Sequence, residues 1–239
     1  MPDRFYLETP PAGDQVDFPE AEVQHLAKVM RVQPGDMVGA FDGSGVEYQV
    51  RIASVGKKQV RGEIVARAEV SREAAVPLTL AVALPKGERQ RWLVEKCVEL
   101  GVTRLIPLVT ERGVAQPVTK AVERLRRTVI EASKQCGRNR LMEVDEGRAL
   151  AEVLESTPAE TRRLVLHPGE APLAEVLGYD PPGSGPAPVL ALIGPEGGFT
   201  DAEVQQATQT GCRAVSLGPR ILRVETAALA IAALITLKS

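Results

Sequence analysis

The stretch LALIGPEGGFT, residues 190–200, joins an apolar run to a turn that holds three glycines and a proline. Four consecutive apolar residues before the turn predict a buried strand. Thr200 and Glu203 have the spacing of a capping box, which predicts that a helix begins there. In open α/β sheets, ligands bind beyond the carboxyl ends of the strands, where glycine lets the backbone approach closely. Taken alone, the stretch favours a ligand-binding loop and a purely structural turn equally.

A second strand-to-helix turn follows in the segment AVSLGPRILRVET, residues 214–226. This loop interleaves charged and apolar side chains, namely Arg220, Arg223 and Glu225 with Ile221 and Leu222. Such a mixture suits a pocket that has an apolar wall and a few polar anchors. Because the two loops follow consecutive predicted strands, a ligand site becomes the favoured interpretation.

Apolar runs alternate with helical patterns over residues 77–239. The predicted strands are residues 78–84, 104–109, 163–166, 189–193 and 214–217, and the clearest predicted helices are residues 86–100, 120–136 and 227–237. This alternation is typical of an α/β domain with a parallel sheet. The last helix is apolar on all sides, which predicts burial in the core or at a subunit interface.

The first part of the chain, residues 1–72, predicts a separate β-rich domain. Its strands are residues 36–41, 46–55 and 59–70, and its single helix is residues 20–31. A small barrel with one helix is the natural arrangement for such short antiparallel strands. The polar stretch before Pro77 marks the boundary between the two domains.

Composition excludes several classes of protein. The chain has 239 residues, 44% of them hydrophobic, and a formal net charge of −2. No apolar run approaches the roughly 20 residues of a membrane span, and the N-terminus lacks the pattern of a signal peptide. Cytosolic location and no membrane association are therefore expected. Two histidines and the lack of a Cys-x-x-Cys pair argue against a zinc site, so no metal is predicted.

Basic residues cluster between Arg124 and Arg140, where six arginines and lysines stand against Glu123 and Glu131. A cluster of this kind favours phosphate binding, although a solvated helix face explains the charge alone equally well. An aromatic content of 3% argues against an extended surface for stacking bases.

Five dispersed motifs resemble one family. They are IGPEGGFT (residues 193–200), LGPRILRVETA (217–227), HLAKVMR (25–31), KQCGRNR (134–140) and LHP (166–168). In their order along the chain they resemble the 16S ribosomal RNA uracil-N3 methyltransferases of the SPOUT superfamily. The chain departs from the family's usual Ser-Glu-Arg-Cys at residues 110–114, TERGV, but it keeps the Glu-Arg pair.

The resemblance implies a PUA-like RNA-binding β-barrel, residues 1–72, followed by a SPOUT α/β domain with a deep trefoil knot, residues 77–239. It implies that the protein methylates N3 of a specific uridine in 16S rRNA of the small ribosomal subunit, near the decoding centre. It also implies S-adenosylmethionine as cofactor and a homodimer in which the partner subunit completes each active site.

The resemblance assigns residues to the cofactor and to RNA. The expected cofactor-binding residues are Leu166, His167, Ile193, Gly194, Glu196, Gly197, Gly198, Leu217, Gly218, Ile221, Leu222 and Thr226. The expected RNA-binding residues are Arg4, His25, Arg31, Arg138, Asn139 and Arg140.

Three residues are candidates for catalysis. Arg223 or Arg138 would stabilise the negative charge that develops on the uracil carbonyl oxygens as N3 loses its proton. Glu225 is a candidate proton acceptor, but a glutamate beside arginines is more often an ion-pair partner and then a poor base. Trp92 is expected in the core.

Other functions remain open. A non-catalytic RNA-binding or assembly protein would leave the two glycine loops without a cofactor. A dehydrogenase or ATPase would need the phosphate-binding fingerprints that this sequence lacks. A ribose 2′-O-methyltransferase of the same superfamily differs only in its product.

Overall fold

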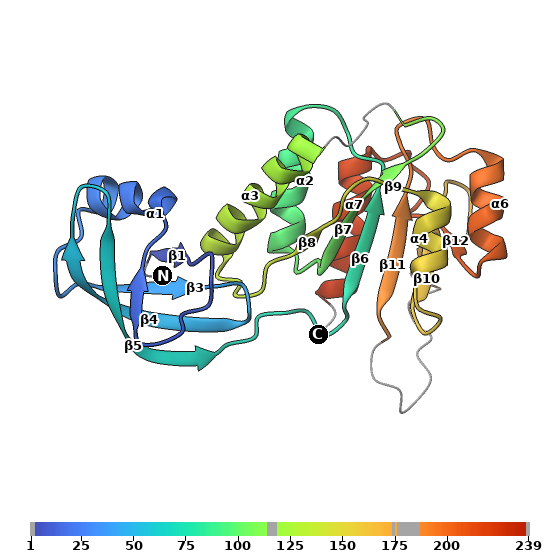
Figure 1. The fold of residues 1–239 in the computed structure, drawn as a ribbon. Helices are drawn as coiled ribbons and strands as arrows, with labels where there is room; N and C mark the ends of the chain where they lie inside the picture. Colours follow the sequence, from blue (N-terminus) through green and yellow to red (C-terminus); the bar gives the residue numbers. More distant parts are fainter. Residues whose placement is uncertain (1–2, 114–118, 174, 176–186, 238–239) are drawn as a thin grey trace. The chain divides into compact units, whose positions relative to one another are not determined.

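The computed structural model describes residues 3–113, 119–173, 175 and 187–237. The chain forms two compact units, each with its own sheet (Figure 1). The first unit comprises residues 1–73 together with 130–141, and the second comprises residues 74–129 and 142–239. Residues 130–141, which the sequence analysis placed in the second domain, therefore group with the first unit. The C-terminal end of the helix predicted over residues 120–136 therefore packs within the β-rich unit.

The first unit is built on a curled sheet of five strands (Figure 1). Its strands are β1 (Arg4–Tyr6), β2 (Gln15–Asp17), β3 (Met37–Phe41), β4 (Val46–Val55) and β5 (Val60–Glu69). They lie in the order β1-β3-β4-β5-β2, with β1 parallel to β3 and the other pairs antiparallel. The edge strands β1 and β2 are not paired in the described residues, so the sheet is not a closed barrel. Phe5, Val50 and Ile52 lie in the core beneath it.

The single helix expected over residues 20–31 is in fact two segments. The α-helix α1 (Glu20–Gln24) continues into the π-helix η1 (His25–Met30). Arg31 adopts the left-handed conformation with a φ of 53°, and the Val32 amide donates a 3.1 Å hydrogen bond to the Leu26 carbonyl. This closes the helix end as glycine usually does. The apolar spacing did not indicate the change of helix type: within η1 Leu26 is buried, whereas Met30 is 38% exposed.

A polar cluster closes the turn between β3 and β4. The Asp42 carboxylate accepts hydrogen bonds from the Ser44 amide at 2.9 Å and from the Tyr48 hydroxyl at 2.8 Å. Burial, together with the hydrogen bond to Asp42 and its negative charge, raises the pKa of Tyr48 to about 12 from 10.0.

We expect a pH dependence of stability from Tyr48. A folded-state pKa above the unfolded one means that its contribution is complete below about pH 10 and is lost as the pH rises towards 12. The check is a spectrophotometric tyrosinate titration of wild-type protein against Tyr48→Phe. The absorbance of wild type minus that of Tyr48→Phe should have its titration midpoint near pH 12. A midpoint near pH 10 would contradict the burial of Tyr48 and its hydrogen bond to Asp42.

The second unit is built on a parallel sheet. Its strands are β6 (Leu78–Val82), β7 (Arg104–Val109), β8 (Glu143–Val144), β9 (Arg148–Ala149), β10 (Arg162–Leu166), β11 (Val189–Ile193) and β12 (Arg213–Val215). The order is β12-β10-β11-β6-β7-β8, and β9 pairs with β7. The predicted parallel α/β fold is confirmed, and every residue of the central β11 is buried.

Helices cover both faces of this sheet. They are α2 (Glu88–Glu99), α3 (Thr119–Cys136), which runs on into the first unit, α4 (Leu150–Ser156), α6 (Asp201–Gln209) and α7 (Val224–Thr236). Leu190 and Leu192 of β11 point into a core shared with α4 and α6. On the opposite face α7 packs on β6 and β11 and also contacts α2. In Figure 1, α4 lies in front of the sheet and α7 behind it.

One expectation about this unit is wrong. Trp92, expected in the core, is 46% exposed on α2, because the inner face of that helix is formed by Leu93, Val94 and Cys97. The final helix is expected in the core or at a subunit interface. Within one chain it packs on the sheet, while Leu234 and the following residue Leu237 are 44% and 66% exposed. Apolar composition alone did not show which side of each helix meets the sheet.

Candidate active site

A cavity of about 360 Å³ lies where three neighbouring parallel strands end. The loops that follow β10, β11 and β12 line it, together with the start of α7. The carboxyl edge of a parallel sheet is where ligands bind in open α/β folds. All the predicted cofactor residues except Thr226 line this cavity, and Thr226 is exposed on the first turn of α7.

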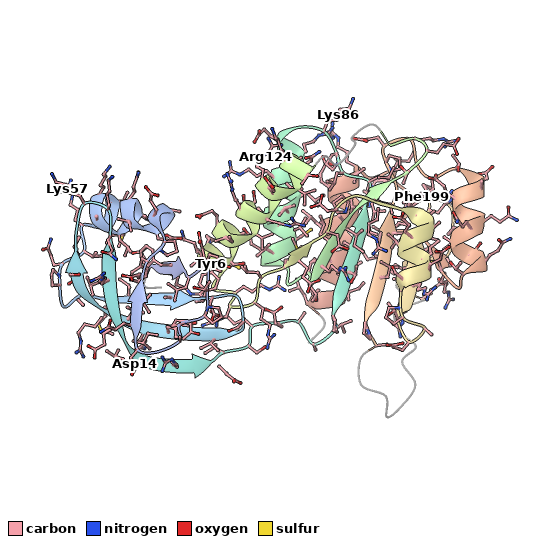
Figure 2. All side chains as sticks on the ribbon, viewed as in Figure 1. Tyr6, Asp14, Lys57, Lys86, Arg124 and Phe199 are labelled. Carbon is pink, nitrogen blue, oxygen red and sulfur yellow. The ribbon has the colours of Figure 1, made fainter. Side chains whose placement is uncertain are left out.

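The loop after β11 forms one wall and has little free space. The Gly198 amide donates a 2.8 Å hydrogen bond to the Pro195 carbonyl, and Gly198 has a φ of 69°. A Cβ at Gly194 would lie 3.0 Å from the amide nitrogen of Phe199, which is itself buried. Any larger residue at position 194 therefore requires Phe199 or the loop to shift. Phe199 is labelled in Figure 2.

The helix start predicted at Thr200 is confirmed. The Glu203 amide donates to the Thr200 hydroxyl at 3.3 Å, and the Thr200 amide donates to the Glu203 carboxylate at 2.8 Å. This reciprocal pair satisfies two backbone amides at the beginning of α6. It fixes where the glycine loop ends.

The loops after β10 and β12 are joined to each other. The His167 amide donates to the Val215 carbonyl at 2.9 Å, and the Ser216 hydroxyl donates to the Glu170 carbonyl at 2.9 Å. Gly218 has a φ of 100°, which lets the second loop turn back toward the cavity. Ile221 lines the cavity while remaining 86% exposed, so an apolar side chain stands in solvent at the mouth.

The structure adds Arg112 to the site, a residue that the sequence analysis left out. Its guanidinium donates a 3.0 Å hydrogen bond to the Gly197 carbonyl, and its side chain lines the cavity. The neighbouring Glu111 amide donates to the Glu203 carboxylate at 3.0 Å. The segment after β7 thus holds the glycine loop from outside. The Glu-Arg pair at residues 111–112, which the chain keeps from the family pattern, was the sequence feature that could have identified Arg112 as a site residue.

The three catalytic candidates lie in different surroundings. Arg223 is the exposed residue immediately before α7, between two residues that line the cavity. Glu225 is only 7% exposed, and its carboxylate lies 3.5 Å from the guanidinium of Arg89. The ion-pair interpretation of Glu225 is therefore favoured, but its partner is on α2 and not one of the neighbouring arginines.

Arg138 has a structural position that the sequence analysis did not foresee. Only 3% of its side chain is exposed, and its guanidinium binds the Glu73 carboxylate through contacts of 2.5 and 2.9 Å. Both residues belong to the first unit, whereas the cavity lies in the second. The assignment of Arg138 to catalysis and to RNA is corrected accordingly, because a buried, paired guanidinium is not presented to a ligand.

Asn139 and Arg4 are buried beside it. Arg4 donates hydrogen bonds to the Asn139 side-chain oxygen and, at 3.1 Å, to the Ser133 carbonyl. The Asn139 amide group donates to the Val70 carbonyl at 2.9 Å. These contacts join the end of α3 to the sheet of the first unit, so Asn139 has a structural role.

The remaining RNA candidates are partly accessible. Arg31 and Arg140 are exposed, and His25 packs against Phe5 with ring centroids 5.6 Å apart. Lys57, labelled in Figure 2, projects from the turn between β4 and β5. Exposed cations of this kind are available to phosphates.

We expect Arg138→Ala to destabilise the first unit, because it leaves the Glu73 carboxylate without its main partner. Removing one member of a buried ion pair costs roughly 3–5 kcal/mol; Glu73 is 21% exposed, so the lower end of that range applies. Urea unfolding should show this loss, while Arg127→Ala, an exposed arginine of α3, should change little. Unchanged stability in Arg138→Ala would contradict the structural role.

Two family models cover most of the chain. One, described as an RNA methyltransferase domain, matches residues 72–236, and the other, described as an RNA methyltransferase PUA domain, matches residues 18–65. The class that the fold and the site define is therefore an RNA methyltransferase domain that follows a PUA domain.

Relatives with known names share nearly the whole chain. The ribosomal RNA small subunit methyltransferase E of Bacillus subtilis is 31% identical over 87% of this chain and 84% of its own length. The corresponding protein of Synechocystis is 32% identical over 89% of this chain and 69% of its own. This chain belongs to the ribosomal RNA small subunit methyltransferase E family, which confirms the resemblance seen in the dispersed motifs.

Solved structures agree with the fold. The Neisseria gonorrhoeae ribosomal RNA small subunit methyltransferase E, bound to S-adenosylmethionine, matches with a TM-score of 0.87 and 33% identity over 98% of this chain and 96% of its own. A methyltransferase of Legionella pneumophila, also with S-adenosylmethionine bound, matches with a TM-score of 0.87 and 32% identity over 98% of this chain and 97% of its own.

Membrane-spanning helices and clusters of metal ligands are both absent from the residues that the structure describes. None of the helices seen there has the length and apolar character to cross a membrane. Within those same ranges, His, Cys, Asp and Glu side chains are not grouped in threes or more as metal ligands would be.

Proposed function

We propose that this protein transfers a methyl group from S-adenosylmethionine to N3 of a uridine in 16S rRNA of the small ribosomal subunit, near the decoding centre. The observation that carries the proposal is the cavity at the ends of β10, β11 and β12, lined by the two glycine loops. The gonococcal and Legionella relatives, which share this fold, were crystallised with S-adenosylmethionine.

The residues present fit this cofactor. A volume of about 360 Å³ falls in the range of roughly 300–1,000 Å³ that ligand pockets have. Ile193, Ile221 and Leu222 offer apolar surface, while backbone amides and carbonyls of the glycine loops offer hydrogen bonds. The absence of a side chain at Gly197 and Gly198 lets a ligand approach the backbone.

The chain's own residues have two tasks in the reaction. Bound S-adenosylmethionine supplies a methyl group on a positively charged sulfur. The loops hold that group in line with the uracil nitrogen, and such alignment removes much of the barrier. Arg223 stabilises the negative charge that spreads to the uracil carbonyl oxygens as N3 loses its proton. Glu225 is not assigned that proton, because its carboxylate is paired with Arg89.

The first unit binds the RNA in this proposal. Arg31 and Arg140 are its exposed candidates, supported by Lys57 at the turn between β4 and β5. We assign Arg4, Arg138 and Asn139 to the framework that carries this surface, and His25 to packing against Phe5. Exposed arginine and lysine side chains of this kind contact phosphates and carry no base sequence information directly.

A homodimer is part of the proposal. Trp92, Leu234 and Leu237 leave apolar surface exposed on α2, on α7 and at the residue that follows α7. A second copy of the chain would cover this surface and complete the active site. Sedimentation equilibrium checks this: a dimer supports it, and a monomer at micromolar concentration contradicts it.

The test of the function combines binding and product analysis. S-adenosylmethionine is titrated calorimetrically into the purified protein, and methylated nucleosides are then identified after incubation with 16S rRNA and with small ribosomal subunits. N3-methyluridine supports the proposal. A ribose 2′-O-methyl product would favour the related alternative, and lack of cofactor binding would favour a non-catalytic RNA-binding protein.

A further inference from the structure

Arg89 is the unexpected residue next to the cavity. It lies in the first turn of α2, and its guanidinium contacts two carboxylates, Glu196 at 3.3 Å and Glu225 at 3.5 Å. Glu196 belongs to the glycine loop after β11, and Glu225 to the first turn of α7. One side chain therefore joins the two segments that frame the cavity.

The position of Arg89 is unfavourable in itself. A cation in the first turn of a helix opposes the helix dipole. The Glu225 carboxylate is 90% buried, and burial of an unpaired charge is far more costly. Pairing with Arg89 offsets part of this cost at Oε1 of Glu225, whereas its Oε2 is buried without a hydrogen-bond partner among the described residues. Arg89 therefore joins a buried carboxylate of α7 to the Glu196 carboxylate of the glycine loop, which is 40% exposed.

Arginine is suited to this role and lysine is not. A guanidinium presents five N–H donors in a planar fork and can contact two carboxylates from separate edges, whereas an ammonium is a point charge. In Arg89 one terminal nitrogen faces Glu196 and the other faces Glu225. Glu196 lines the cavity, while Arg89 and Glu225 stand behind the lining.

We propose that Arg89 is a positioning residue that holds the glycine loop of Glu196 and the start of α7 in the geometry that binds the cofactor. The inference rests on the proposed function of this cavity. It assigns Glu225 to the architecture of the site, and it makes α2 a third element that determines cofactor affinity. Without Arg89, the loop and the helix start would lose the contact that joins them, and part of their ordering would fall to cofactor binding, at the expense of affinity.

The test measures the Kd of S-adenosylmethionine by calorimetry for wild-type protein, Arg89→Ala and Arg89→Lys. We expect the Kd of Arg89→Ala to rise about fivefold to tenfold, because one or two partly exposed charge pairs contribute a free energy that corresponds to this change. Arg89→Lys should give an intermediate value because it retains one contact. Arg91→Ala, an exposed arginine two residues further along α2, is the matched control and should bind as wild type.

A double-mutant cycle separates positioning from general stability. In a Glu196→Gln, Glu225→Gln background, the further change Arg89→Ala should raise the Kd by less than twofold, because the partners are already neutral. Equal Kd values for wild type and Arg89→Ala, or an undiminished effect in that background, would overturn the inference. A wild-type protein that binds no S-adenosylmethionine would instead overturn the proposed function, on which the inference rests.

Discussion

Gly194→Val protein is expected to bind S-adenosylmethionine at least about 100-fold more weakly than wild type, or about 2.7 kcal/mol. Already a Cβ at this position would lie 3.0 Å from the Phe199 amide nitrogen and 3.0 Å from its ring. Phe199 is buried in the core shared with α4 and α6 and also lines the cavity. Relief of the contact therefore displaces either the glycine loop or Phe199 at the cavity wall, and a displacement near 1 Å of groups that position a ligand has effects of this size.

The measurement is calorimetric titration, with circular dichroism as the check on folding. Overpacking costs about 1–3 kcal/mol of stability, so the titration is made well below the unfolding temperature of the variant. Gly13→Val, the same substitution in the first unit, is the matched control. A Cβ at Gly13 meets nothing within 4 Å, so the Kd should stay within a few-fold of wild type. A folded Gly194→Val protein with wild-type affinity would contradict the placement of the cofactor.

The part of the site that local sequence determines could be predicted. Buried strands of a parallel sheet appear as unbroken apolar runs, and the run before Gly194 ends where β11 ends. The capping pair Thr200 and Glu203 is separated by three residues, so its hydrogen bonds follow from spacing alone. Because parallel strands bring their carboxyl ends to one edge, loops far apart in the chain meet at one cavity.

Contacts between distant residues could not be predicted in the same way. Arg89 pairs with Glu196 and Glu225, which lie more than a hundred residues further along the chain. Nothing in their spacing distinguishes them from other surface charges. Family resemblance supplied the positions of the loops, but it did not show which element holds them.

The segment around Arg138 shows the limit of arguments from charge. A basic run beside a glycine-terminated helix predicts a phosphate-binding surface. In the structure Arg138 and Asn139 are buried, with their side chains bonded to Glu73 and to the Val70 carbonyl. Charge indicates that a residue needs a partner, and only the fold shows whether that partner is a ligand or a carboxylate of the same chain.

Arg223→Ala is expected to lower kcat about 100-fold and to leave the Kd of S-adenosylmethionine within a few-fold of wild type. Losing one group that stabilises developing charge costs roughly 10²–10³ in kcat. Arg223 stands at the end of the second loop, exposed and outside the cavity lining, where it can reach a base presented at the mouth. An effect on kcat alone is the signature of an interaction made in the transition state.

Single-turnover methylation of 16S rRNA with saturating cofactor measures this directly. Arg213→Ala, an exposed arginine at the other end of β12, is the matched control and should methylate at the wild-type rate. Arg223→Lys should recover part of the rate, because the charge stays while the planar fork is lost. Wild-type turnover by a folded Arg223→Ala protein would exclude the catalytic role. A raised KM for RNA at unchanged kcat would mean that Arg223 holds the RNA equally tightly before and during methyl transfer, because uniform binding changes KM and not kcat.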